Sequence, residues 1–172
     1  MSPARERPIA AELLLLCAPV WVVALRQALP ELLGWSGLAP DLLLLAAAVG
    51  AWRHAPAPAV LFAAAGATLL DVPSAVPFGL AAGRLAVCTA LFASLRGGLR
   101  AELPGVGVVV VAAFALLERL LQLLTLWAFQ PDLALSPLLA RAGAVALVTG
   151  LMAPLGFAVS RALRPPPPRG RP

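Results

Sequence analysis

Long apolar runs, separated by short polar breaks, follow one another along the whole chain. The breaks are marked by charges, prolines and glycines, which are the residues expected where apolar helices end. They divide the chain into segments that each predict one helix, and the pattern as a whole predicts an all-α fold. The six segments are Ile9–Leu29, Leu38–Trp52, Ala55–Leu70, Pro77–Leu95, Leu103–Phe129 and Leu135–Leu163.

The length of each segment decides whether it can cross a bilayer. A spanning helix needs about 20 apolar residues, within a range of about 17–25. The first segment and the last three reach this length, whereas Leu38–Trp52 and Ala55–Leu70 are short. Two alternatives are open for the short pair: both span while neighbouring helices shield them, or together they form a re-entrant hairpin.

Composition identifies the solvent in which these segments fold. Hydrophobic residues make up 61% of the chain, charged residues 12%, and the mean hydropathy is +0.92. A soluble domain carries about 25% charged residues, so the sequence predicts an integral membrane protein. The arginines are scattered around the apolar segments rather than gathered with aromatic residues in one patch, so no nucleic acid partner is expected.

The arginines also predict an orientation. If all six segments span and the N-terminus is inside, nine arginines fall in the cytoplasmic pieces and only Arg26 in the outer ones. This is a strong positive-inside bias, and a re-entrant hairpin would instead bury Arg53 at its tip. We therefore expect six transmembrane helices with both termini in the cytoplasm, residues 1–164 as one transmembrane domain, and residues 165–172 as a disordered Pro/Arg-rich cytoplasmic tail. The nine are Arg5, Arg7, Arg53, Arg96, Arg100, Arg161, Arg164, Arg169 and Arg171.

Four charged residues lie within the predicted helices: Arg84, Glu118, Arg119 and Arg141. Counted at 1.5 Å per residue, all four fall roughly 10 to 17 Å from the outer surface. A charge at such a depth costs about 2.5 to 3.5 kcal/mol even on the lenient insertion scale, so pairing is expected. Glu118 is expected to pair with Arg84 or Arg141.

Polar residues also recur along one face of the fifth predicted helix. Glu118, Gln122 and Thr125 follow at i, i+4 and i+7, which places them on the same side. Such a face avoids lipid, and three interpretations remain open: structural contact, contact with a partner helix, or a ligand pocket. In the fourth predicted helix, Gly79 and Gly83 have the GxxxG spacing that lets another helix approach closely.

Catalytic motifs are not found. His54 is the single histidine, Cys17 and Cys88 lie in apolar runs without a CxxC, and none of GxSxG, HExxH or GxxxxGK[ST] occurs. The sequence therefore predicts no enzymatic activity, no cofactor and no metal site.

Residues 39–87 carry a pattern that resembles a known family: "APDLLLLAAAVGAWRHAPAPAVLFAAAGATLLDVPSAVPFGLAAGRLAV". This stretch resembles the signature region of the rod shape-determining MreD family: Pro-Asp before a leucine run, a basic turn, an apolar run with a glycine that ends in Leu-Leu-Asp, and a glycine that opens the next helix. The matching positions are Pro40, Asp41, Leu42 to Leu45, Gly66, Leu69, Leu70, Asp71 and Gly79.

The resemblance implies a function. A protein of this family is a non-enzymatic scaffold of the bacterial inner membrane that binds MreC, a single-span protein. Through MreC it acts on the elongation transpeptidase, its SEDS glycosyltransferase partner and MreB, and so on peptidoglycan synthesis and rod shape. The family is also similar in fold to the substrate-binding subunits of energy-coupling-factor transporters. The oligomeric state is left open, with a homo-oligomer among the alternatives.

Within this interpretation Asp41 and Asp71 lie close together at the periplasmic rim. Asp41 is expected to cap the second helix, and Asp71 to accept hydrogen bonds from the start of the fourth helix or from Arg84. With Pro40, Gly79 and Gly83 they would form the rim on which a partner helix docks. Two other classes of function remain: a vitamin-type small-molecule-binding subunit of a transporter, and a structural protein of another envelope complex.

Overall fold

The computed structural model describes residues 18–28, 39–53, 55–72, 77–95, 103–132 and 134–162. Within this part of the chain every regular element is a helix, so the predicted all-α fold is confirmed there. Residues 18–28 are helical, and the labelled helices are α2 (Leu42–Arg53), α3 (Pro56–Asp71), α4 (Leu80–Leu95), α5 (Pro104–Phe129), α6 (Leu135–Leu151) and α7 (Ala153–Ala162).

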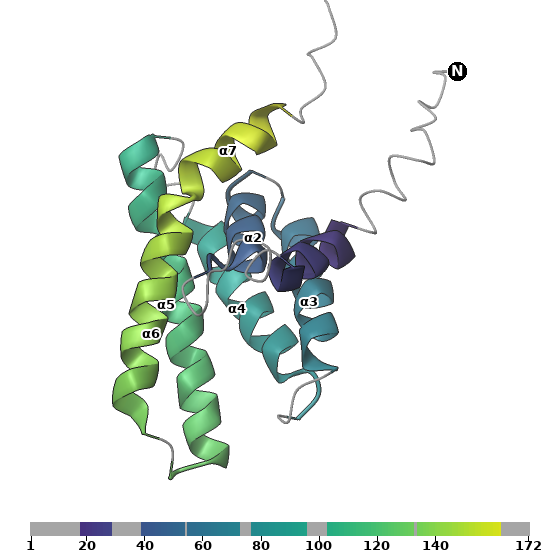
Figure 1. Ribbon diagram of the computed structural model, residues 1–172. Helices are drawn as coiled ribbons and strands as arrows, with labels where there is room; N and C mark the ends of the chain where they lie inside the picture. Colours follow the sequence, from purple (N-terminus) through teal and green to yellow (C-terminus); the bar gives the residue numbers. More distant parts are fainter. Residues whose placement is uncertain are drawn as a thin grey trace, which may run out of the picture.

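Two helical hairpins make up most of the molecule (Figure 1). Helix α3 packs along α4, and α5 packs along α6, while α7 continues from α6 at an angle. Only a few residues of the chain separate the two helices of each hairpin, as is usual for neighbouring antiparallel helices.

Helix α2 lies between the hairpins and contacts each of the other labelled helices. Its 12 residues extend over about 18 Å, which is less than the roughly 30 Å of a hydrocarbon core. Most of its side chains are buried, and around its C-terminal end Trp52 packs edge-on against Phe92, which packs against Phe114. The short second segment is thus a central helix shielded by its neighbours.

Two predicted boundaries are wrong. The fourth segment was expected to be helical from Pro77, but residues 77–79 form a turn and α4 has only 16 residues, which is short for a span. The last segment was expected to be one helix, but it divides into α6 and α7 at Met152. Pro154 explains the division, because its ring removes the N–H that would bond to Gly150 and clashes with that carbonyl.

Two helical stretches are long and apolar enough to cross a membrane: Gly105–Phe129, and Leu135–Ala162, in which α6 and α7 are taken together. Only 33% of each apolar window is buried by the rest of the chain. Large apolar side chains point outward on the other helices as well, such as Leu61, which is 70% exposed, while Asp41, Asp71 and Glu118 are buried. Apolar groups outside and charged groups inside are typical of a protein whose surroundings are lipid.

Close helix approaches depend on glycines other than the predicted pair. A Cβ at Gly150 of α6 would lie 2.7 Å from the Cβ of Ala112 and 2.8 Å from the carbonyl oxygen of Val108, both in α5. Gly79 instead lies in the turn before α4 with φ of 91°, and a Cβ at Gly83 would have no neighbour within 4 Å among the described residues. The GxxxG spacing therefore does not serve a contact within the described fold.

Several predictions fall on residues outside the described ranges. These are the proline-rich tail of residues 165–172, the N-terminal part of the first apolar segment, and the arginine-containing loop of residues 96–102.

Candidate functional site

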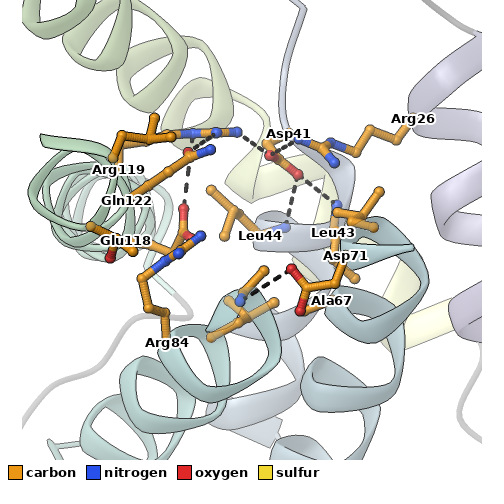
Figure 2. A pocket seen from close by; sticks show the side chains of 15 residues that line it. Arg26, Asp41, Leu43, Leu44, Ala67, Asp71, Arg84, Glu118, Arg119 and Gln122 are labelled. Atoms are coloured by element: carbon orange, nitrogen blue, oxygen red, sulfur yellow. Dashed lines mark hydrogen bonds and ion pairs between the residues drawn. The ribbon is translucent and has the colours of Figure 1, made fainter. Parts of the chain in front are cut away.

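Three of the buried polar residues, Asp41, Asp71 and Glu118, line a cavity beside the middle of α5 (Figure 2). A second cavity adjoins it. The inner cavity, of about 210 Å³, lies between α2, α3, α4 and α5. The outer cavity, of about 670 Å³, is lined by residues 26–27, by residues 39–41 and by α5 and α6. Arg26, Asp41, Arg119 and Gln122 line both.

Asp41 holds the N-terminus of α2. Its Oδ1 accepts hydrogen bonds from the backbone N–H groups of Leu43 (3.1 Å) and Leu44 (3.2 Å), as predicted for an N-cap. Its own backbone N–H donates to Oγ1 of Thr149 in α6, at 2.9 Å. Because α2 begins inside the bundle, its first N–H groups cannot reach bulk water, and the aspartate satisfies them.

The other carboxylate oxygen of Asp41 forms ion pairs with two arginines, which approach it from opposite sides (Figure 2). The Arg26 guanidinium lies 3.1 Å from Oδ2, and Arg119 of α5 forms an ion pair with the same oxygen. A second nitrogen of Arg119 donates to Oε1 of Gln122 at 2.6 Å. Asp41, which is 5% exposed, thus joins the helical stretch 18–28, α2, α5 and α6.

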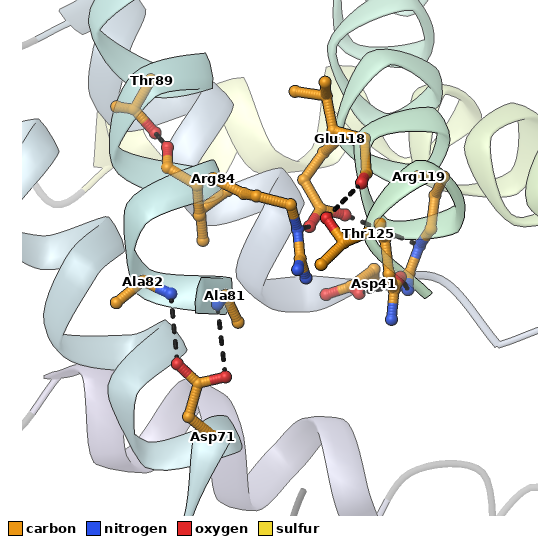
Figure 3. A network of polar contacts seen from close by, with 12 residues as sticks. Asp41, Asp71, Ala81, Ala82, Arg84, Thr89, Glu118, Arg119 and Thr125 are labelled. Carbon is orange, nitrogen blue, oxygen red and sulfur yellow. Dashed lines mark hydrogen bonds and ion pairs between the residues drawn. The ribbon is translucent and has the colours of Figure 1, made fainter. Parts of the chain in front are cut away.

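Asp71 holds the start of α4 in the same way (Figure 3). Its Oδ2 accepts from the N–H groups of Gly79 (3.0 Å) and Ala82 (3.3 Å), and its Oδ1 accepts from Ala81 (3.3 Å). The predicted role of Asp71 at the start of this helix is confirmed. The positive φ of Gly79, a conformation that glycine adopts without strain, brings its N–H to the carboxylate.

Glu118 is bracketed by two arginines. Its Oε1 lies 3.6 Å from Nε of Arg84 on α4, and its Oε2 lies 4.0 Å from Nε of Arg119 (Figure 3). Of the two partners expected for Glu118, the structure therefore shows Arg84. This contact joins one hairpin to the other. Both of its residues line the inner cavity, together with Asp41 and Asp71.

The remaining residues of the predicted polar face divide between the cavities. Thr125 lines the inner cavity and donates from Oγ1 to the carbonyl of Leu121, at 2.7 Å. Arg141 is exposed and lines the outer cavity together with Pro40. Among the described residues no carboxylate lies within ion-pair distance of Arg141.

Two members of this cluster were missed from the sequence. Arg26 was assigned to an outer loop, although it lies at the end of the helical stretch 18–28 and binds Asp41. Thr149 was overlooked because a single threonine in an apolar helix usually bonds within its own helix. Its complete burial and its bond to the Asp41 N–H appear only in three dimensions.

Comparisons with protein-family models, with curated proteins and with solved structures find no match for this chain. The resemblance to the MreD family therefore depends on the residues quoted above.

The geometry of the cluster is suited to holding helices and charges. Asp41 and Asp71 accept hydrogen bonds from helix starts, and Asp41 and Glu118 form ion pairs with arginines. No group of three or more His, Cys, Asp or Glu side chains gathers in the described ranges to form a metal site. Removing one member of such a buried set leaves an uncompensated charge, which is strongly destabilising. The inner cavity, whose lining has three arginines and three carboxylates, lies at the junction between the two hairpins.

Proposed function

We propose that this chain is a non-enzymatic, multi-pass scaffold of the bacterial inner membrane that takes part in cell elongation, as the MreD resemblance implies. Both termini lie in the cytoplasm. It holds an MreC-like single-span protein by helix-to-helix contact, and through this partner it influences the peptidoglycan synthases of the elongation machinery.

The observation that carries the proposal is that the residues of the resemblance depend on one another in space. Asp41 caps the leucine run of α2, and a Cβ at Gly66 would lie 2.5 Å from Cδ1 of Leu43 in that run. Asp71 in turn binds the N–H of Gly79. The aspartate before the leucine run, the glycine against that run and the Leu-Leu-Asp ending thus contact one another or the next helix start, which gives a physical reason for their order and spacing.

The surface supports a partner in the membrane. On α4, Gly83, Val87 and Leu91 follow at i, i+4 and i+8, and all three are exposed. A glycine followed by branched apolar residues lets a second helix approach closely and pack along the stripe. Within the proposal, this stripe on α4 receives the membrane helix of the MreC-like partner.

The proposal is tested by co-purifying the MreC-like partner from bacterial membranes with the tagged chain. Gly83→Leu is expected to reduce the recovered partner about tenfold, because the larger side chain separates the helices. Gly143→Leu is the matched control, since a Cβ at Gly143 on α6 also has no neighbour within 4 Å. If the unsubstituted chain retains no MreC-like protein, the proposed function is wrong. If Gly83→Leu and Gly143→Leu retain the partner equally, the function stands, but the stripe on α4 is not the docking surface.

A second candidate function is favoured by the size of the outer cavity. Its volume of about 670 Å³ falls in the range of about 300–1,000 Å³ typical of small-molecule sites. A vitamin-type binding subunit would retain its ligand through purification, so mass spectrometry of the purified protein for a bound metabolite tests this alternative directly.

A further inference from the structure

The outer cavity carries more positive charge than the described residues compensate. Arg26, Arg119 and Arg141 line it, and the single carboxylate of its described lining is Asp41. Both Arg26 and Arg119 bind the same oxygen of Asp41, so one negative charge is shared by two cations. Arg141 has no acidic partner in the described chain. Arg119 also lies 4.0 Å from Glu118, so the three arginines of the outer cavity face two carboxylates, and the formal excess of one positive charge belongs to Arg141.

An uncompensated charge in such surroundings is costly, and an anion in the cavity would remove that cost. The inner cavity does not have this property, because Glu118 and Asp71 add two carboxylates there. The outer cavity is also the larger of the two, and only it has a volume in the range of ligand sites.

The donors in the outer cavity have the chemistry of a phosphate site. Guanidinium groups bind phosphate oxygens in a bidentate manner, and here they come from residues 18–28, α5 and α6. Gln122 accepts the hydrogen bond of Arg119 with Oε1, which leaves its amide nitrogen as a further donor. The side chains of Leu123, Leu126, Leu138 and Val145 also line the cavity and offer an apolar surface beside the charges.

We propose that the outer cavity binds a phosphate group, carried either by a phospholipid headgroup or by a soluble anion. Arg141 supplies the charge that is free to engage it, while Arg119 and Gln122 are held in place by their mutual hydrogen bond. This proposal does not depend on the partner-binding function, because it is argued only from the charges and volume of the cavity. It would stand even if no MreC-like partner were found.

The experiment uses the full-length chain, purified in a neutral detergent, and native mass spectrometry with added phosphatidic acid or phosphatidylcholine. We expect one phosphatidic acid to be retained in preference to phosphatidylcholine. Arg141→Gln should lower that retention about tenfold, because one charge-assisted contact is lost. The variant should fold, since the exposed Arg141 makes no ion pair with a described residue, and its melting temperature checks this.

Arg161→Gln is the matched control. Arg161 lies on α7 outside both cavities, so a general attraction of interfacial arginines for anionic lipid would be weakened equally by both substitutions. Inorganic phosphate and pyrophosphate are titrated against the bound lipid and, separately, against the lipid-free protein. If these anions displace the lipid, or stabilise the lipid-free protein saturably in a way that Arg141→Gln abolishes, the ligand is a soluble anion. If the lipid stays bound while the anions are added, the ligand is the phospholipid headgroup. Equal binding by the unsubstituted protein, Arg141→Gln and Arg161→Gln in all arms would overturn the proposal.

Discussion

At the scale of single residues, Asp41 is where separate parts of the chain meet. One carboxylate oxygen caps α2, the other binds Arg26 and Arg119, and the backbone N–H bonds to Thr149. A neutral amide of the same size could still accept hydrogen bonds from α2, but it could not compensate two guanidinium charges. The charge of Asp41, rather than its shape, is therefore what stabilises the cluster.

Asp41→Asn is expected to destabilise the protein by about 1–3 kcal/mol, because it leaves the partly buried Arg26 and Arg119 without the carboxylate that they share. The measurement is thermal unfolding of the purified protein in detergent, together with its accumulation in membranes. Asp132→Asn is the control, since Asp132 is exposed in the turn between α5 and α6 and should change stability little. Equal melting temperatures for the two variants would show that the ion pairs contribute nothing to stability.

At the scale of helices, the contact between α5 and α6 depends on the absence of a side chain at Gly150. The space that a Cβ would need is occupied by Ala112 and by the carbonyl oxygen of Val108. Backbone atoms cannot move aside as the end of a flexible side chain can, so the two helices would have to separate.

Gly150→Ala is therefore expected to cost about 1–3 kcal/mol, as overpacking does in other close-packed interiors. Gly143→Ala on the same helix meets nothing within 4 Å and should be neutral or stabilising by up to about 1 kcal/mol, the intrinsic preference of alanine for helix. Unfolding in denaturing detergent compares the two. If both variants unfold alike, α5 and α6 do not approach as closely as the structure has them.

At the scale of the whole molecule, many large apolar side chains face outward, whereas the carboxylates Asp41, Asp71 and Glu118 are buried. Such a distribution would aggregate in water, where exposed apolar patches associate, and it is favourable where lipid covers the surface. If the bundle spans a membrane as proposed, the arginines outside the helices are expected to decide which end faces the cytoplasm.

Topology reporters test this arrangement. A fusion after residue 98, in the loop with Arg96 and Arg100, is expected to report the cytoplasm, and a fusion after Asp132 the outer side. Fusions at the two positions control for each other, because they bracket α5, which is long enough to cross the membrane. Identical locations for both would mean that α5 does not span.

Much of the fold could be predicted because long apolar runs between charges, prolines and glycines define where helices begin and end. The expected helix Leu103–Phe129 appears as Pro104–Phe129, and the expected helix Ala55–Leu70 as Pro56–Asp71. The errors arose where local chemistry overrides hydropathy. Asp71 holds residues 77–79 in a turn, and Pro154 interrupts an otherwise apolar helix.

By itself the sequence predicted the all-helical class and the cap of Asp41, because hydropathy and helix capping depend on a few neighbouring residues. For Asp71 it left two partners open, the start of the fourth helix and Arg84. Only the tertiary structure decided that α2 is central, that Arg26 and Thr149 belong to the cluster, and that Glu118 pairs with Arg84. These contacts join residues far apart in the chain. Which of several arginines reaches a carboxylate depends on how the helices pack, and that packing is set by the volumes and charges of all of them together.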